Sequence, residues 1–260
     1  MCCIIEIADL WKEYPRVKKI TDVILHPRKK DVFTALKGVS IKFRKSEFTA
    51  IVGLNGAGKS TLLKILSGIL LPTKGRIYID NLELCANLKK IKEKVSFISS
   101  EGKGFYWALT ARENLNFFGA LYGINRSRLK KRIEELSDLF AIKQLDNQLY
   151  NYSSGYKEMI FIIKALLNDS QVLFFDEPAK SLDYMARERL LGFVREELVR
   201  VRKKTVIVGT NSLENLEIYD RLVILDRGLI MAEGTIEELK QKSGGYNKNN
   251  RQIFEYYVAK

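Results

Sequence analysis

A glycine-rich loop between an apolar run and a helical run constrains the fold of this chain more than any other feature. Residues 48–52 are mainly apolar, and residues 61–70 have the pattern of a helix. A strand, a glycine loop and a helix in this order are typical of a P-loop, where backbone N–H groups and the helix N-terminus surround a phosphate. The loop consists of Gly53, Leu54, Asn55, Gly56, Ala57, Gly58, Lys59, Ser60 and Thr61.

Each residue type in this loop has a physical role. Gly53, Gly56 and Gly58 allow positive φ and leave no Cβ between the main chain and a ligand. Lys59 can reach the β- and γ-phosphate oxygens, and the Ser60 hydroxyl is placed to bind Mg²⁺. The alternative is a tight loop capped by a helix, and the flanking strand and helix argue against it. We therefore expect a nucleotide triphosphate site.

The length and composition fit one domain, or a core with a subdomain. The chain has 260 residues, 46% of them hydrophobic, and a net charge of +13, which favours phosphate-bearing partners or an anionic membrane surface. Cys2, Cys3 and Cys85 are odd in number and lack metal-site spacing, so free thiols in a reducing cytosol are expected. We find neither a signal-peptide pattern nor an apolar run long enough to span a bilayer.

Apolar runs alternate with helical patterns along the second half of the chain, which predicts an α/β fold with a parallel, doubly wound sheet. Residues 110–168 are expected to be mainly helical. Thr110 and Glu113 form a capping-box pattern at the start of that region. The expected strands are residues 33–43, 48–52, 76–80, 95–98, 171–175, 206–209 and 222–225, and a helix is expected over 185–200.

Two acidic residues end one of the buried strands. Asp176 follows residues 171–175, at the carboxyl end of the strand, where ligands of open α/β sheets bind. An aspartate in this position downstream of a P-loop predicts a second magnesium ligand. Glu177 can then accept a proton from an attacking water or orient that water. Asp176 could instead be an ordinary strand-end carboxylate, but its pairing with a P-loop favours the magnesium role.

Three other segments leave alternatives open. Tyr14 can stack on a purine, or it can be a half-buried residue at a strand end. The basic loop 16–31 can be simply solvated, or it can contact lipid headgroups or a membrane partner. The end of the chain, from about Gly244, can be a tail or a short docking helix.

Four segments together resemble the ATP-binding cassette (ABC) transporter ATPases. Besides the P-loop, these are Ser153-Ser154-Gly155-Tyr156, Phe174-Phe175-Asp176-Glu177-Pro178 and Ser181-Leu182-Asp183, in the order that the family has them. The resemblance covers residues 4–240, with a C-terminal tail over 241–260. It implies a P-loop NTPase core with a mainly parallel sheet, a small antiparallel β subdomain and a helical subdomain at about 103–168. The loop 16–31 and residues 105–107 resemble the exporter branch, ABC-2 included.

The resemblance also implies a dimer around ATP and Mg²⁺. Each ATP would lie between the P-loop of one subunit and the helix start at Ser153 and Gly155 of a second subunit, either a copy or a homologue. An integral-membrane permease subunit would convert the closing and opening of this dimer into transport. The chain is then expected to be peripheral, at the cytoplasmic face of the cell membrane, with no transmembrane segment of its own and with no nucleic-acid partner.

The sequence departs from the family pattern in three places. Ser100 stands where a glutamine is usual, Ser154 stands where a glycine is usual, and Asn211 stands where the family has a switch histidine. Asparagine can hydrogen-bond to a phosphate oxygen but cannot carry a proton. Since Glu177 is retained, we expect intact ATP binding with weakened turnover. Two alternatives remain: a regulatory half of an asymmetric ABC heterodimer, and a soluble ABC ATPase acting on nucleic acid.

Overall fold

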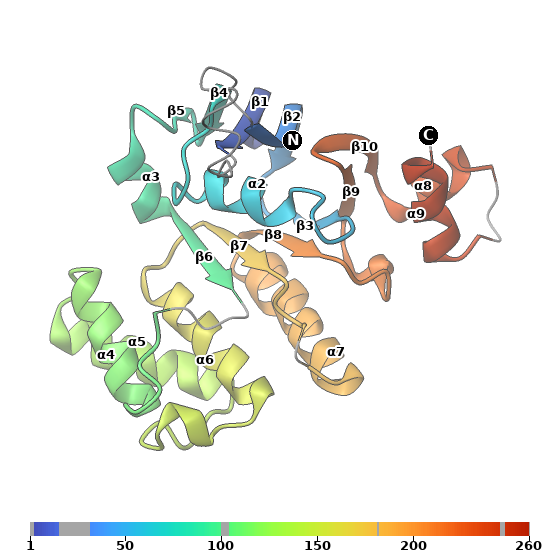
Figure 1. Cartoon of the computed structure of the whole chain (residues 1–260). Helices are drawn as coiled ribbons and strands as arrows, with labels where there is room; N and C mark the ends of the chain where they lie inside the picture. The colour runs from blue at the N-terminus through green and yellow to red at the C-terminus, as the bar shows by residue number, and fades with distance from the viewer. Residues whose placement is uncertain (1–2, 16–31, 100–103, 181, 245–247, 260) are drawn as a thin grey trace, which may run out of the picture.

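The computed structural model describes residues 3–15, 32–99, 104–180, 182–244 and 248–259. The basic loop 16–31, Ser100 and Ser181 therefore lie outside the described residues. Two sheets and a lobe of helices make up the fold (Figure 1). Among the described residues, no helix has both the length and the apolar composition that crossing a bilayer requires.

The larger sheet carries the P-loop. Its six strands run in the order β10-β9-β3-β8-β7-β6; all neighbours are parallel except the edge pair β9 and β10. This confirms the prediction of a mainly parallel sheet. The strands are β3 (Phe48–Val52), β6 (Val95–Ser99), β7 (Val172–Asp176), β8 (Thr205–Thr210), β9 (Arg221–Asp226) and β10 (Leu229–Gly234).

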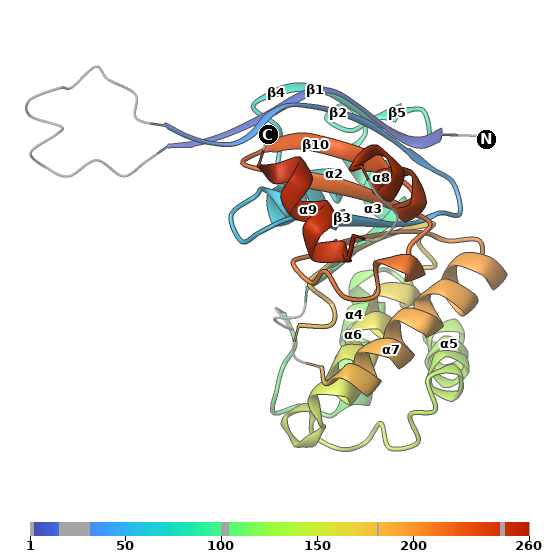
Figure 2. The same cartoon turned by 90° about the vertical axis from the view of Figure 1, so that its right-hand side faces the viewer.

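A smaller antiparallel sheet lies on the other side of the P-loop helix, as the predicted fold class requires. Its order is β2-β1-β4-β5, and the strands are β1 (Cys3–Pro15), β2 (Val32–Arg44), β4 (Lys74–Ile79) and β5 (Leu82–Glu83). Helix α2 (Lys59–Leu66) runs between the two sheets in both views (Figures 1 and 2). Its Leu62, Leu63, Ile65 and Leu66 are buried in one core with residues of both sheets. Burial on two sides fixes the helix, and so fixes the P-loop that precedes it.

The helical lobe lies below the larger sheet in the view of Figure 1. It contains α4 (Ala111–Leu121), α5 (Arg126–Leu139) and α6 (Ser154–Leu167). The capping box predicted at the start of α4 is present: the Thr110 side chain accepts from the Glu113 backbone, and the Glu113 carboxylate accepts from the Thr110 backbone. On α5, Leu129, Ile133 and Leu136 are buried, as their helical spacing predicts.

The remaining helices flank the larger sheet. A helix was expected over 185–200; it begins at Tyr184 as α7 (Tyr184–Phe193) and continues as a π-helical segment (Val194–Val201). Helix α3 (Leu88–Lys94) precedes β6. At the C-terminus, α8 (Ile236–Lys242) and α9 (Asn250–Val258) lie beside β9 and β10 (Figure 2). Ile253 and Phe254 of α9 are buried in the main core, so this segment packs against the sheet.

Candidate active site

Two of the three P-loop glycines, Gly53 and Gly58, stand where a side chain would not fit, whereas a Cβ on Gly56 would meet nothing within 4 Å. A Cβ on Gly53 would lie 2.3 Å from the Leu225 carbonyl oxygen of β9. Gly58, at φ +110°, would place a Cβ 2.7 Å from the Ala35 carbonyl oxygen. Backbone therefore packs directly on backbone at both ends of the loop, which holds the start of α2 at the mouth of the sheet.

Lys59 is buried inside the curve of the loop. Only 5% of the residue is exposed, and its Nζ donates to the carbonyl oxygens of Gly53 at 2.8 Å and Leu54 at 3.2 Å. The Glu177 Oε1 atom lies 3.5 Å from the same Nζ. Three oxygens thus hold the ammonium at the loop, next to the acid that follows β7.

Ser60 and Asp176 meet at the ends of two neighbouring elements. Ser60 is the second residue of α2, Asp176 is the last residue of β7, and the Ser60 hydroxyl donates to Asp176 Oδ1 at 2.8 Å. Asp176 pairs in parallel register with Ser99 of β6 and Gly209 of β8. The carboxyl ends of the central strands therefore converge on one hydroxyl–carboxylate pair, as expected for a ligand site at this edge.

Glu177 is linked to the P-loop through Asn211. The Glu177 backbone has φ +52°, and its N–H donates to the Gly209 carbonyl at 2.9 Å. Its Oε2 atom accepts from the Asn211 backbone N–H at 3.3 Å. The Asn211 Nδ2 atom donates to Asn55 Oδ1 at 3.2 Å. The predicted base, the residue at the switch position and the mouth of the loop thus form one polar chain.

One cavity of about 330 Å³ unites most of the predicted nucleotide residues. The predicted residues that line it are Asn55, Gly56, Ala57, Gly58, Lys59, Ser60, Thr61, Asp176, Glu177 and Asn211. Gly53 and Leu54 lie in the same loop but do not line it. Sequence reasoning missed Phe33, Ala35, Ser99 and Lys180, which also line it. Of these four, only Lys180 could have been found from the sequence, because it lies three residues after Glu177.

Tyr14 lies near this cavity without lining it. Its hydroxyl is 3.5 Å from Thr61 Oγ1, and the Lys12 ammonium lies 5.2 Å from the centroid of its ring. In the antiparallel register of β1 and β2, Tyr14 is the partner of Phe33, which does line the cavity. Both rings therefore share one face of the smaller sheet, beside the start of α2.

Ser153 and Gly155 are not brought to the P-loop cavity of the same chain. Ser153 is the N-cap of α6, and its side chain accepts from the Tyr156 backbone N–H at 3.4 Å. Ser153 lines a separate cavity of about 550 Å³ together with Tyr152 and Tyr156. The nearest neighbour of a Cβ added to Gly155 would be Leu182 at 3.8 Å, so this helix start has space around it.

Two ionisable groups of α6 are shielded from water. Glu158 is 2% exposed, and burial raises its pKa to about 8. Its Oε2 atom has no hydrogen-bond partner among the described residues. Burial also lowers the pKa of Lys164, whose Nζ lies 4.5 Å from the centroid of the Phe118 ring. Lys164 lines a cavity of about 370 Å³ together with Ser60 and Asp176, so the shielded lysine shares a cavity with this pair.

Comparisons with known proteins agree with this arrangement. Residues 36–180 match the family model described as ABC transporter. The ABC transporter ATP-binding protein NatA of Bacillus subtilis is 30% identical over 223 residues, covering 85% of this chain and 90% of NatA. The linearmycin resistance ATP-binding protein LnrL of the same organism is 32% identical, covering 82% of this chain and 68% of LnrL.

Solved structures share the fold. One described as an ATP-binding subunit of an ABC transporter superposes with a TM-score of 0.79 and 25% identity, covering 98% of this chain and 99% of the other. A dimeric, post-hydrolysis ATP-binding cassette bound to ADP and phosphate has a TM-score of 0.76 and 24% identity, covering 90% and 99%. The family match spans more than half of the chain and includes the P-loop, Asp176 and Glu177. The chain therefore belongs to the ABC transporter family, as an ATP-binding subunit that hydrolyses ATP.

Proposed function

We propose that this protein is the ATPase subunit of an ABC exporter and that it closes around ATP with a second cassette subunit. The observation that carries the proposal is the division of the predicted site between two places. The P-loop, Asp176, Glu177 and Asn211 share one cavity, whereas Ser153 and Gly155 lie at a separate helix start of the same chain. A second subunit can bring its own helix start over the first subunit's P-loop.

The two halves are chemically complementary towards a triphosphate. The P-loop supplies backbone N–H groups, the positive end of α2 and the Lys59 ammonium. The opposing half supplies the N-terminus of α6 and the Ser153 hydroxyl, which suit the exposed side of a γ-phosphate. ATP then holds the two subunits together, and loss of the γ-phosphate weakens the interface between them. Tyr14 and Thr61 flank the region beyond the phosphates, where the base would lie.

Mg²⁺ suits the pair formed by Ser60 and Asp176. This ion is usually held by one or two protein oxygens together with phosphate oxygens and water. The Ser60 hydroxyl and the Asp176 carboxylate lie 2.8 Å apart and provide such oxygens. When bound, the ion would offset the negative charge of the phosphates.

In this proposal Glu177 acts as the general base. Its carboxylate lies beside Lys59 and Asn211, at the edge of the cavity that receives the phosphates. From there it can hold a water and take its proton as the water attacks the γ-phosphate. Asn211 can donate a hydrogen bond to the γ-phosphate or to that water, but it cannot shuttle a proton. We therefore infer a slower turnover than a histidine at this position would allow.

The membrane subunit is a separate chain in this proposal, and the ATPase is peripheral, at the cytoplasmic face. The face of α4 supports a docking role, because Phe117 and Leu121 are exposed there and Tyr106 packs edge-on against Phe117 at 5.1 Å. Exposed apolar side chains next to one another mark interaction surfaces. The name of the relative LnrL, a resistance protein, supports export.

A second candidate function is the regulatory half of an asymmetric pair of cassettes. One observation favours it: Asn211 bonds to Asn55 across the mouth of the P-loop, so the switch position is occupied by a group that cannot titrate. In such a pair the better-preserved partner would perform most of the hydrolysis.

Affinity purification of the tagged chain from detergent-solubilised membranes of its own cells tests the proposal. We expect a polytopic membrane protein in stoichiometric amount, with or without a second cassette protein. Leu121→Glu should reduce this recovery, whereas Val201→Glu should not, although both side chains are about two-thirds exposed, at 65% and 67%. Recovery of RNA without a membrane protein would refute the transporter assignment. Recovery of a second cassette protein whose ATPase motifs are better preserved would favour the asymmetric pair.

A further inference from the structure

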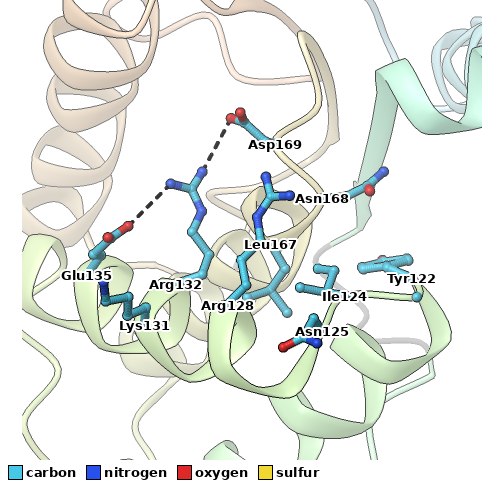
Figure 3. A pocket seen from close by; sticks show the side chains of 11 residues that line it. Tyr122, Ile124, Asn125, Arg128, Lys131, Arg132, Glu135, Leu167, Asn168 and Asp169 are labelled. Atoms are coloured by element: carbon cyan, nitrogen blue, oxygen red, sulfur yellow. Dashed lines mark hydrogen bonds and ion pairs between the residues drawn. The ribbon is translucent and has the colours of Figure 1, made fainter.

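A cavity of about 620 Å³ lies in the helical lobe, away from the residues of the P-loop site. Three segments form it: the turn between α4 and α5, one face of α5, and the end of α6 (Figure 3). Leu167 is buried at its base and Ile124 is half-buried, while polar side chains form the rest of the wall. None of the residues proposed for ATP binding lines it.

The charges of this cavity are unbalanced. Arg132 contacts both acidic side chains of the wall, Glu135 at 3.7 Å and Asp169 at 3.3 Å. Lys204, the residue before β8, contacts Asp169 as well, at 2.7 Å. Both carboxylates are thus already partnered, and Asp169 is shared between two cations. The two carboxylates of the wall are thus paired with Arg132 of the wall and with Lys204 beside it.

Arg128 and Lys131 make no such close contact, although the charge of Arg128 still acts on the Asp169 carboxylate. Within the described part of the chain, neither side chain has an ion pair or a hydrogen bond, although both line the cavity. They are three residues apart on α5, and Arg132 follows at the next position, so three cations share one face of the helix. In Figure 3 the Arg128 side chain extends beside that of Arg132, towards Asn168 and Asp169. Like charges this close repel one another, and an anion between them would relieve the repulsion.

Neutral donors lie on the same wall. Asn125 uses its Oδ1 atom to accept from the Ser127 backbone N–H at 2.9 Å, which leaves its amide N–H₂ group for another partner. Tyr122 also lines the cavity, and a phenol hydroxyl is protonated at neutral pH and can donate. The N-terminus of α5 adds its positive end to the same side of the cavity. Cations, amide and hydroxyl groups together are the donors that phosphate oxygens accept.

We propose that this basic cavity binds a phosphate-bearing anion, with Arg128 and Lys131 as its cationic contacts. The volume accommodates a phosphate group together with a small organic part, such as the glycerol of a lipid headgroup. A free phosphate compound and the headgroup of an anionic lipid would use the same contacts. The site is independent of the proposed exporter function, because none of its residues belongs to the ATP site.

Two double variants with the same loss of charge on the same helix test the proposal. Arg128→Ala/Lys131→Ala removes the two cavity cations, whereas Arg126→Ala/Lys130→Ala removes two exposed cations of α5 that do not line it. ADP and Mg²⁺ are kept saturating so that the P-loop is filled. Inorganic phosphate is titrated by thermal shift, and sedimentation with phosphatidylglycerol vesicles is compared with phosphatidylcholine vesicles.

We expect parent protein and Arg126→Ala/Lys130→Ala to bind alike, and Arg128→Ala/Lys131→Ala to bind at least about tenfold more weakly, because charge-assisted hydrogen bonds are lost. Binding of inorganic phosphate would assign a soluble ligand, and binding of phosphatidylglycerol vesicles alone would assign a lipid headgroup. Equal weakening in both double variants would overturn the proposal, since only general charge would matter. If the parent protein binds neither inorganic phosphate nor phosphatidylglycerol vesicles, the proposal is overturned as well.

Discussion

Replacing Glu158 by glutamine should stabilise the protein at neutral and alkaline pH and change little at pH 5. Glu158 lies in the second turn of α6, 2% exposed, and its Oε2 atom has no hydrogen-bond partner among the described residues. Burial without a partner disfavours the carboxylate form. The pKa of the side chain is therefore raised from 4.5 to about 8 in the folded protein.

The magnitude follows from the two pKa values. Between them the folded protein holds a proton that the unfolded chain has released, so the free energy of unfolding falls as pH rises from 4.5 to about 8. At about 1.4 kcal/mol for each pH unit, the loss reaches about 3 kcal/mol at pH 7. For a protein of this size, that corresponds to a fall in Tm on the order of 6–12 °C. Glutamine does not titrate, so Glu158→Gln should lack this loss.

Thermal unfolding followed by circular dichroism at pH 5, 6, 7 and 8 measures the effect. The Tm of the parent protein should fall relative to that of Glu158→Gln as pH rises. Glu134→Gln, at an exposed position of α5, controls for removal of one negative charge in the same lobe. Parallel Tm profiles for the parent and Glu158→Gln would refute the reasoning, because the buried carboxyl would then have the same pKa in both states.

Three further substitutions probe the site. Gly53→Ala should destabilise by about 1–3 kcal/mol in urea unfolding, because its Cβ would meet the Leu225 carbonyl oxygen, whereas Gly192→Ala, on the open side of α7, should stabilise by up to about 1 kcal/mol. Asn211→His should raise steady-state ATP turnover and make it fall below about pH 6.5; unchanged turnover would mean that this position is not limiting. Lys59→Ala should abolish ATP binding in calorimetry, and retained affinity would argue against the P-loop assignment.

The parts of the site that lie close in sequence could be predicted from it. The order of Gly53, Lys59 and Ser60 indicates one tight loop before a helix. The apolar run that ends in Asp176 indicates a strand buried in a parallel sheet. Backbone sterics and burial impose both patterns locally, so the sequence carries them. The capping box at Thr110 was predictable for the same reason.

Contacts that depend on tertiary packing could not be predicted. Phe33 reaches the P-loop cavity because β2 pairs with β1, and the 16 residues between the two strands hide that register from the sequence. The bond from Asn211 to Asn55 joins residues 156 positions apart. Glu158 looks like a surface residue of an amphipathic helix, yet only 2% of it is exposed. Such burial is set by the packing of helices, and helical spacing alone does not give it.

Phosphate release by the purified protein, compared with that of Glu177→Gln in a single turnover of Mg-ATP, tests the central claim most directly. If Glu177 takes the proton of the attacking water, the substitution should slow release by about 10²–10⁴-fold and leave ATP affinity unchanged. Equal rates for the two proteins would contradict the assignment of the base, and with it the proposed mechanism of hydrolysis.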